Sequence, residues 1–385
     1  MTALAMDKET IYQQLSKLYS GPRVIKTDAI GLPLGWAGSW QVTRAEDIRF
    51  VLQNPEIFSS RSSAGFSRLL GEDWDLIPLE KDPPDHGKFR AIMNGVFSPT
   101  KINAMEHGVR QRAAELIEAF APTGACEFVE AFARPFPVSV FMQLMGLPAS
   151  DASKLNDLEY GLLHSADMQE RVAAAKGFYT YLSDFIALRR RVPADDLTSF
   201  CIQAQIDGRP TTDEEVMGMC YLLVVAGLDT VAAILSLHFR HLALFPEDQR
   251  RLRDDPSLIP SAVEELLRAY SILTTSRLVT KDVEIGGQAL KAGDRVVCSL
   301  PLACLDPDEF ADPMTVDFQR SPNRHVAFSY GPHRCVGSHL ARRELIIAIE
   351  EVLRRVPPFR VAPGSDAPIH SFGIYCVPRL PLVWA

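Results

Sequence analysis

Residues 328–337 read FSYGPHRCVG, and this loop carries the clearest chemical signal in the chain. Apolar residues recur at helical spacing over 340–353, so a helix is predicted to begin directly after the loop. Free N–H groups and the positive dipole end at a helix N-terminus favour the thiolate form of Cys335. Gly331 can adopt backbone angles that are closed to other residues, and Gly337 leaves room for a flat ligand beside the main chain.

A thiolate in this setting suits the axial ligation of haem iron. The alternative is a buried structural cysteine near a turn, which would be the better interpretation of any lone cysteine. Here the pattern Phe-x-x-Gly-x-His-x-Cys-x-Gly extends over ten residues and resembles the haem-binding loop of the cytochrome P450 family. The resemblance favours the ligand interpretation. It implies haem b (iron protoporphyrin IX), with the Cys335 thiolate as axial ligand.

Composition and charge are those of an ordinary soluble globular protein. The 385 residues are 47% hydrophobic and 23% charged. This length allows two or three domains, but no linker, repeat or low-complexity tract divides the chain, so we expect one catalytic domain over residues 1–385. The net charge of −8 argues against a general nucleic-acid-binding protein.

The seven cysteines show no C-x-x-C pair and no regular spacing, which indicates a reduced, cytoplasmic chain. Polar and charged residues interrupt the N-terminus, so no signal peptide or membrane anchor is expected there. Residues 217–235 are apolar and nearly long enough to span a bilayer. Asp229 falls within this segment, and a charge at mid-membrane costs about 2.5–3.5 kcal/mol. We therefore expect a buried central helix and no membrane association.

Hydrophobic periodicity predicts a mainly α-helical fold with small peripheral β-sheets. The predicted helices cover 45–52, 85–97, 101–120, 136–145, 152–163, 171–190 and 259–270, and a long helix opens near Thr211 or Thr212. The predicted strands cover 40–43 and 295–300, with a hairpin around Gly286-Gly287 and β-like segments near the C-terminus.

The long apolar helix contains Ala226-Gly-Leu-Asp-Thr230, and glycine, aspartate and threonine are all poor choices for its interior. The Thr230 hydroxyl can bond the carbonyl of Ala226, four residues earlier. With Gly227 removing bulk, the helix would open into a groove beside a ligand. The alternative is a simple kink with a satisfied buried acid at Asp229.

Beside a haem-thiolate loop, this segment resembles the oxygen-binding groove of cytochromes P450. The resemblance implies that Ala226 and Gly227 lie against the cofactor. It also implies that Asp229 and Thr230 deliver protons for O–O cleavage, which is general acid work by positioned side chains.

A haem carries two carboxylates, and when the haem is buried these require charged hydrogen-bonding partners. His86 and Arg90 are four residues apart on one predicted helix face, although a solvated basic face is an alternative for His86. Arg277 and His333 match further propionate-binding positions of the family. The expected cofactor-binding residues are His86, Arg90, Arg277, His333, Phe328, Gly337, Ala226 and Gly227.

Glu265 and Arg268 are three residues apart, a spacing that usually gives only a minor surface pair. In their position they resemble the Glu-x-x-Arg motif of the family, a structural ion-pair network behind the haem. Arg320 is the expected third member. These residues are predicted to stabilise the fold, without a catalytic role.

From Trp74 to Trp384 the chain is similar to bacterial members of the family, notably the camphor-hydroxylating enzyme and its relatives. Trp74 takes the position of a tyrosine that binds the substrate ketone in that enzyme. An indole donates one hydrogen bond and fills more apolar volume, so a compact terpenoid or norisoprenoid other than camphor is expected. The expected substrate-binding residues are Trp74, Leu222, Val225, Leu273 and Ile374.

No flavin or nicotinamide fingerprint is visible, so electrons must come from outside. The resemblance implies a [2Fe–2S] ferredoxin with a separate NAD(P)H-dependent ferredoxin reductase. A basic docking surface is one interpretation of five cations near the haem-binding segments, and dispersed surface charge is the other. The five are Lys88, Arg90, Arg334, Arg342 and Arg343.

The resemblance implies a monooxygenase that inserts one atom of O2 into a C–H bond and releases the other as water. One alternative is a peroxide-driven peroxygenase, and another is a haem-based ligand sensor without turnover. Both alternatives are disfavoured by the intact Asp229-Thr230 pair, which neither of them needs.

Overall fold

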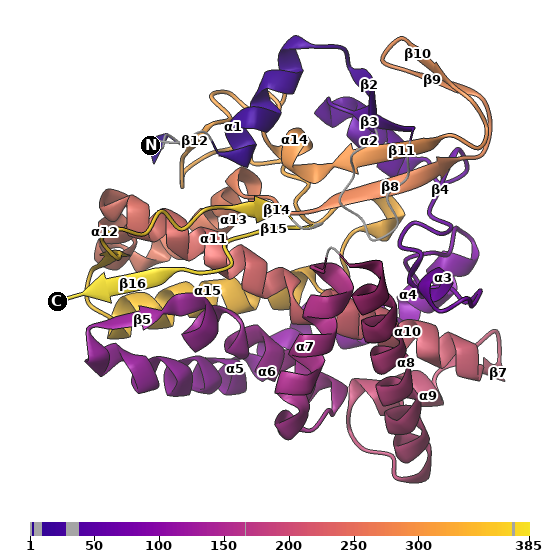
Figure 1. The fold of residues 1–385 in the computed structure, drawn as a ribbon, viewed down its shortest axis with the longest axis horizontal. Helices are drawn as coiled ribbons and strands as arrows, with labels where there is room; N and C mark the ends of the chain where they lie inside the picture. Colours follow the sequence, from indigo (N-terminus) through magenta and orange to yellow (C-terminus); the bar gives the residue numbers. More distant parts are fainter. Residues whose placement is uncertain (1, 4–9, 28–37, 166, 372–373) are drawn as a thin grey trace.

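The computed structural model describes residues 2–3, 10–27, 38–165, 167–371 and 374–385. Helices make up most of it, and the small sheets lie toward the edges of the helical body (Figure 1). The mainly α fold is therefore confirmed. The α-helices of the described residues are α1 (Ile11–Ser16), α2 (Ala45–Gln53), α3 (Phe66–Leu69), α4 (Asp85–Val96), α5 (Pro99–Phe120), α6 (Pro135–Met145), α7 (Ala152–Leu163), α8 (Met168–Arg191), α9 (Leu197–Gln203), α10 (Asp213–Leu228), α11 (Thr230–Leu244), α12 (Pro246–Asp254), α13 (Ile259–Ala269), α14 (Leu300–Cys304) and α15 (Ser338–Arg355).

The largest sheet has the strand order β2-β3-β11-β8-β4. Within it, β11 runs antiparallel to β8 and parallel to β3, which places Val296 between Arg277 and Trp40. The strands of this sheet are β2 (Val24–Thr27), β3 (Ser39–Val42), β4 (Phe58–Ser59), β8 (Thr274–Val279) and β11 (Arg295–Ser299). The smaller sheets contain β1 (Thr2–Ala3), β5 (Ala125–Glu127), β6 (Gln205–Ile206), β7 (Arg209–Pro210), β9 (Val283–Ile285), β10 (Gln288–Leu290), β12 (Thr315–Val316), β13 (Phe359–Val361), β14 (His370–Ser371), β15 (Tyr375–Cys376) and β16 (Pro381–Trp384).

The helices α10 and α11 form the centre of the fold. A capping box at Thr212 opens α10, because the Thr212 hydroxyl accepts from the backbone N–H of Glu215, whose carboxylate accepts from that of Thr212. Every residue of α11 from Val231 to Ala243 is buried. By length and composition the stretch 213–244 qualifies as a membrane span, but 72% of its most apolar window is buried. It is therefore the core helix that the sequence predicted.

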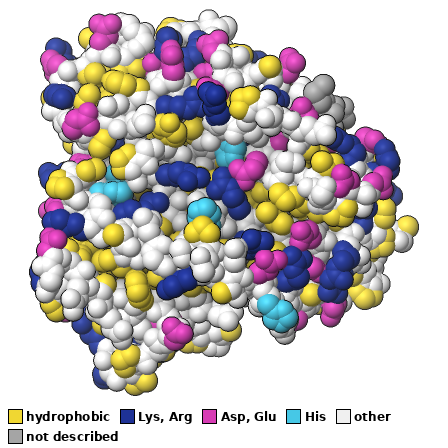
Figure 2. All heavy atoms as spheres, turned by 180° about the vertical axis from the view of Figure 1, so that it is seen from behind, with side chains coloured by type: hydrophobic (Ala, Val, Ile, Leu, Met, Phe, Trp, Pro, Cys, Tyr) yellow, Lys and Arg dark blue, Asp and Glu magenta, His cyan; other side chains and the backbone are white. Residues whose placement is uncertain are grey.

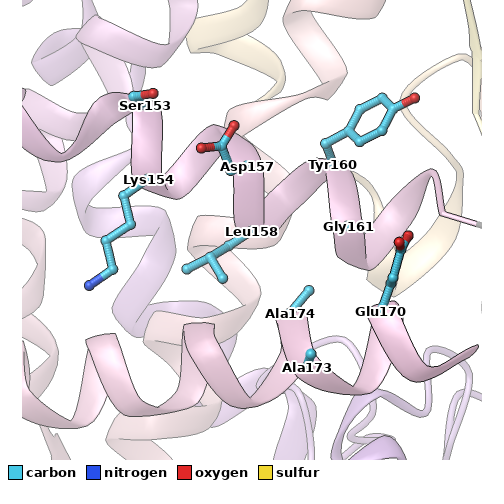
Figure 3. Close-up of a pocket in the computed structure, with 9 residues that line it drawn as sticks. All are labelled: Ser153, Lys154, Asp157, Leu158, Tyr160, Gly161, Glu170, Ala173 and Ala174. Atoms are coloured by element: carbon cyan, nitrogen blue, oxygen red, sulfur yellow. The ribbon is translucent and has the colours of Figure 1, made fainter.

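The helices α7 and α8 pack side by side at very close range. A Cβ at Gly177 of α8 would lie 2.4 Å from Leu158 of α7, and one at Gly161 would lie 3.1 Å from the Ala174 Cβ. Glycine at these positions therefore brings the two backbones together. Figure 3 shows Leu158 directed from α7 toward the helix that carries Ala174.

The long loop before α4 is fixed by one buried carboxylate, that of Glu80. Its Oε1 accepts the backbone N–H groups of Ala64 (2.9 Å) and Gly65 (3.0 Å), and its Oε2 accepts that of Leu76 (2.9 Å). Glu80 is 2% exposed, so these charge-assisted bonds form away from solvent. They connect the two ends of a loop that borders the central cavity.

Candidate active site

One cavity of about 400 Å³ collects most of the predicted site residues. The Asp229-Thr230 step and Cys335, far apart in the sequence, both line it. Its wall is predominantly apolar, with Leu222, Val225, Leu273 and Ile374 among the lining residues. The structure thus gathers these four predicted substrate contacts around one space.

The central helix breaks at Asp229. Helix α10 ends at Leu228 and α11 begins at Thr230, with Asp229 between them at φ −105° and ψ −33°. The Thr230 hydroxyl donates to the carbonyl oxygen of Ala226 at 2.9 Å. This confirms the predicted side-chain bond, which takes up a carbonyl that the interrupted helix would otherwise leave free.

Gly227 lines the cavity, as the sequence predicted, and it also makes room for a neighbouring ring. A Cβ at this position would lie 2.4 Å from the ring of Phe141 on α6. Its missing side chain therefore makes room for an aromatic neighbour, which itself lines the cavity. The opening beside the ligand site is formed by the break at Asp229 and by the small side chain of Ala226.

The cysteine loop is held by backbone contacts. The N–H of Cys335 donates to the Phe328 carbonyl at 2.8 Å. Gly331 has φ +70°, and a Cβ there would lie 2.3 Å from the Leu52 carbonyl oxygen, so only glycine fits. A Cβ at Gly337 would meet only the Cys335 Sγ, at 3.9 Å, among the described atoms. That side of the loop opens into the cavity and can accept a flat group.

The protein surroundings alone do not lower the Cys335 pKa. Burial of the thiol raises its pKa, and this outweighs the Gly337 N–H and the charges of Arg90, Arg334 and Arg342, which lower it. The Gly337 N–H thus favours the thiolate, as the sequence predicted for this loop, but it does not outweigh burial. A metal ion bound by Cys335 would supply the missing positive charge, since a coordinating thiol is deprotonated outright.

Four basic side chains line the same cavity: His86 and Arg90 of α4, Arg277 of β8, and His333. The imidazole rings of His86 and His333 lie 4.2 Å apart, and both Nε2 atoms are buried without a hydrogen-bond partner. Arg277 is 2% exposed. Burial is the main cause that lowers the pKa of each group, and it takes that of His333 to about 2.

Four basic groups crowded beside a cavity need anions. The carboxylates of a haem would accept from the unpartnered Nε2–H groups and offset the buried positive charge. The open side of Gly337 and the thiol of Cys335 suit the flat ring and its iron. The residues present therefore fit a haem, and they would hold it through Cys335 and these four side chains.

Trp74 is buried against two aromatic rings. It is absent from the lining of the cavity, and its ring packs against Tyr221 of α10 (5.2 Å between centroids) and Tyr179 of α8 (6.0 Å). Large aromatic side chains gain most from such mutual burial, and this drew the indole away from the cavity. Trp74 therefore does not line this cavity, and its role in substrate binding stays a prediction.

Glu265, Arg268 and Arg320 meet in one buried network. The Glu265 carboxylate accepts two bonds of 2.8 Å from Arg268 and two more, of 3.1 and 3.2 Å, from Arg320. Asn323 and the backbone N–H of Asp317 also donate to it. Arg268 reaches the carbonyls of Cys304, Pro313 and Thr315, so this helix is bonded to distant loops.

Sequence reasoning missed His164, which directly follows α7. Its Nε2 lies 2.9 Å from the Asp229 Oδ2, which joins α7 to the break in the central helix. The two residues are 65 positions apart, and neither local periodicity nor a motif connects them. Only the packing of α7 against α10 brings them together.

Comparison with known proteins agrees with this geometry. Residues 162–373 match the family model described as Cytochrome P450. A probable cytochrome P450 127A1 from Sinorhizobium fredii is 43% identical over 349 residues, covering 90% of this chain and 84% of the relative. The mycinamicin IV hydroxylase/epoxidase of Micromonospora griseorubida is 33% identical over 355 residues, covering 90% and 89%. The crystal structure of cytochrome P450 CYP101C1 matches with a TM-score of 0.87 at 33% identity, covering 100% of this chain and 96% of that one.

Proposed function

The chain belongs to the cytochrome P450 family of haem-thiolate monooxygenases, and from this premise we propose that it hydroxylates a small terpenoid or norisoprenoid. The cofactor of the family is haem b with a cysteine thiolate ligand, and O2 is the co-substrate. One observation supports the assignment of roles in this chain. Cys335, the Asp229-Thr230 step and four basic side chains line a single cavity.

The reaction consumes O2, two electrons and two protons, and yields the alcohol and water. When bound, the haem supplies the site at which O2 is reduced and one oxygen atom is transferred to the substrate. Asp229 lines the cavity and delivers protons, and the Thr230 hydroxyl, fixed by Ala226, orients their transfer. The apolar wall excludes water and orients the substrate by shape.

Replacing Thr230 by alanine is expected to uncouple oxygen consumption from hydroxylation. The variant keeps the apolar wall but loses the hydroxyl beside Asp229. Positioned general acids contribute about 10²–10⁴-fold to rate, so we expect the product formed per O2 consumed to fall about tenfold or more. Thr230→Ser is the matched control, because it keeps the hydroxyl. Unchanged coupling in Thr230→Ala would argue for a sensor instead.

The size and lining of the cavity support a small apolar substrate. The haem takes part of about 400 Å³, and the remaining wall is mainly aliphatic, with Phe141 beside it. Relatives of similar identity include a mycinamicin IV hydroxylase/epoxidase and a nocardicin C N-oxygenase, so membership of the family does not select a substrate. We infer a compact, largely apolar ligand.

Titration of the ferric protein tests this substrate class. We expect compact terpenoid and norisoprenoid ketones and alcohols to shift the Soret band from low to high spin, because an apolar ligand that fills the cavity displaces water from the iron. Long unbranched fatty acids of similar hydrophobicity serve as the control. A shift with the fatty acids alone would contradict the terpenoid assignment and leave the monooxygenase assignment intact.

Electrons are proposed to come from a [2Fe–2S] ferredoxin and a separate NAD(P)H-dependent reductase. The predicted docking surface is smaller than expected, because three of its five cations have acidic partners: Lys88 with Asp85 and Asp207, Arg342 with Glu264, and Arg343 with Glu106. A fourth, Arg90, lines the cavity. Arg334, next to Cys335, is exposed and has no acidic partner among the described residues.

Figure 2 shows Lys and Arg side chains gathered across the middle of one face, with acidic side chains among them. On a chain with a net charge of −8, such local positive charge supports an acidic redox partner. We further propose that residues 1–385 act as one catalytic domain in the cytoplasm. The seven cysteines support this compartment, since all are free thiols.

A further inference from the structure

Glu159, His164 and Asp229 form a buried cluster beside the active site. The His164 Nε2 lies 2.9 Å from the Asp229 Oδ2 and 3.5 Å from the Glu159 Oε1. The three side chains are 8%, 9% and 15% exposed for His164, Glu159 and Asp229. Two carboxylates therefore face the same nitrogen of one imidazole.

One N–H cannot satisfy both carboxylates. At 2.9 Å the Nε2–H serves Asp229, and the Glu159 Oε1 remains buried without a hydrogen-bond partner. A buried carboxylate in this position is stabilised by taking up a proton of its own. Burial and the charge of Asp229 raise the Glu159 pKa to about 7.

His164 is the cation of the cluster. Burial lowers its pKa, but the hydrogen bond to Asp229 and the charges of Asp229 and Glu159 outweigh burial and raise it to about 10. Near neutral pH the imidazole is therefore protonated, and Glu159 exchanges a proton with its surroundings.

The cluster extends from the cavity toward the protein surface. Asp229 lines the cavity, whereas Glu159 and His164 do not. The ring of His164 stacks on Tyr160 at 5.3 Å, and Tyr160 is 60% exposed. In Figure 3 Tyr160 projects from α7 away from the helix that carries Ala174. Glu159 and His164 thus lie between solvent and the acid of the active site.

The neighbouring elements contribute other titratable groups. Arg134, before α6, slightly lowers the Glu159 pKa, and the Cys376 thiol of β15 stays neutral because burial raises its pKa to about 12. From α8, Glu170 accepts from the Ser165 hydroxyl, and Arg171 donates to the Ser165 carbonyl. Among these described groups, Glu159 is the one with a pKa raised to near neutrality.

We propose that Glu159 and His164 relay protons from solvent to Asp229, with Glu159 as the store. The His164 Nε2–H proton passes to the Asp229 Oδ2, and the freed Nε2 lone pair takes the proton of the Glu159 carboxyl. Glu159 then takes up a proton from solvent, and the cluster returns to its starting charge when Asp229 releases its proton into the cavity. This inference rests on the proposed function, because it needs a reaction that consumes protons at Asp229.

Infrared difference spectroscopy tests, without turnover, whether Glu159 holds a proton near neutral pH. The resting ferric protein is compared between about pH 5.5 and pH 8.5, on either side of the shifted pKa. We expect a carboxylic acid C=O band that is lost at the higher pH and is absent from Glu159→Gln. Asp157→Asn, which changes an exposed carboxylate on the same helix, should keep the band. A wild-type spectrum that Glu159→Gln leaves unchanged would overturn the proposal.

Turnover tests the relay, and EDTA is present to remove adventitious metal ions. In the wild type, the product formed per NAD(P)H should fall as pH rises through about 7, because Glu159 loses its proton. Glu159→Gln and His164→Gln should lower kcat about tenfold at pH 6 and flatten this profile, with KM unchanged because neither residue lines the cavity.

Asp157→Asn should keep the wild-type profile. If the wild-type protein forms no product, the proposed function is contradicted, while the infrared result on Glu159 remains valid. A wild-type pH profile in Glu159→Gln, together with normal turnover, would overturn the relay alone.

Discussion

Serine in place of Cys335 is expected to abolish hydroxylation and to change the Soret spectrum of the reduced, CO-bound protein. Serine has nearly the same shape, so the loop and its bond from residue 335 to the Phe328 carbonyl remain. Its hydroxyl does not supply the electron donation of a thiolate. Loss of a neighbour that merely supports a metal ligand costs about 10–100-fold, and loss of the ligand itself should exceed that.

The matched control is Cys126→Ser, a partly buried cysteine on β5 that does not line the cavity. It should retain the thiolate-type spectrum and full activity. Far-ultraviolet circular dichroism shows whether each variant is folded. A thiolate spectrum in folded Cys335→Ser would mean that another cysteine binds the iron.

Glutamine in place of Glu265 is expected to destabilise the protein by about 3–5 kcal/mol, because it leaves a buried cation without its counter-charge. Arg268 is 0% exposed, and Arg320 shares the same carboxylate. Typical proteins have only about 5–15 kcal/mol of stability, so this loss is a large fraction of the total.

Urea unfolding followed by circular dichroism measures the effect as a lower midpoint. The control is Glu264→Gln, one residue earlier, where the carboxylate is 34% exposed and binds His325 and Arg342. Pairs open to solvent contribute about 1 kcal/mol or less, so a smaller shift is expected there. Equal shifts for both variants would refute the special role of the Glu265 network.

The predictions from sequence held where the chemistry lies in consecutive residues. The break at Asp229 and the bond from Thr230 to Ala226 follow from five adjacent residues, because a mid-helix threonine has few other partners. The positive φ at Gly331 likewise follows from its place in the loop. Helix α7 was predicted with its observed bounds, since its periodicity is strong.

Predictions failed where tertiary packing decides. The sequence suggests Trp74 as a substrate contact but does not tell where its ring points, and two tyrosines from other helices decide that. Gly227 lines the cavity as predicted, but nothing in the sequence indicated the Phe141 ring that also requires glycine there. His164 was not singled out at all, because its importance depends on Asp229, which approaches only in the folded chain. No local pattern records such contacts.

The Glu80 carboxylate fixes the backbone of its loop by binding main-chain groups and not side chains. Its three bonds go to backbone N–H groups, which every residue except proline has. Side chains between residues 64 and 76 can therefore be exchanged while the backbone path persists, except at Gly65 and Gly71, whose positive φ angles favour glycine. Single replacements in this loop can therefore change the substrate preference while the backbone stays in place. The loop is for the same reason a suitable target for mutant libraries in which Glu80 is kept.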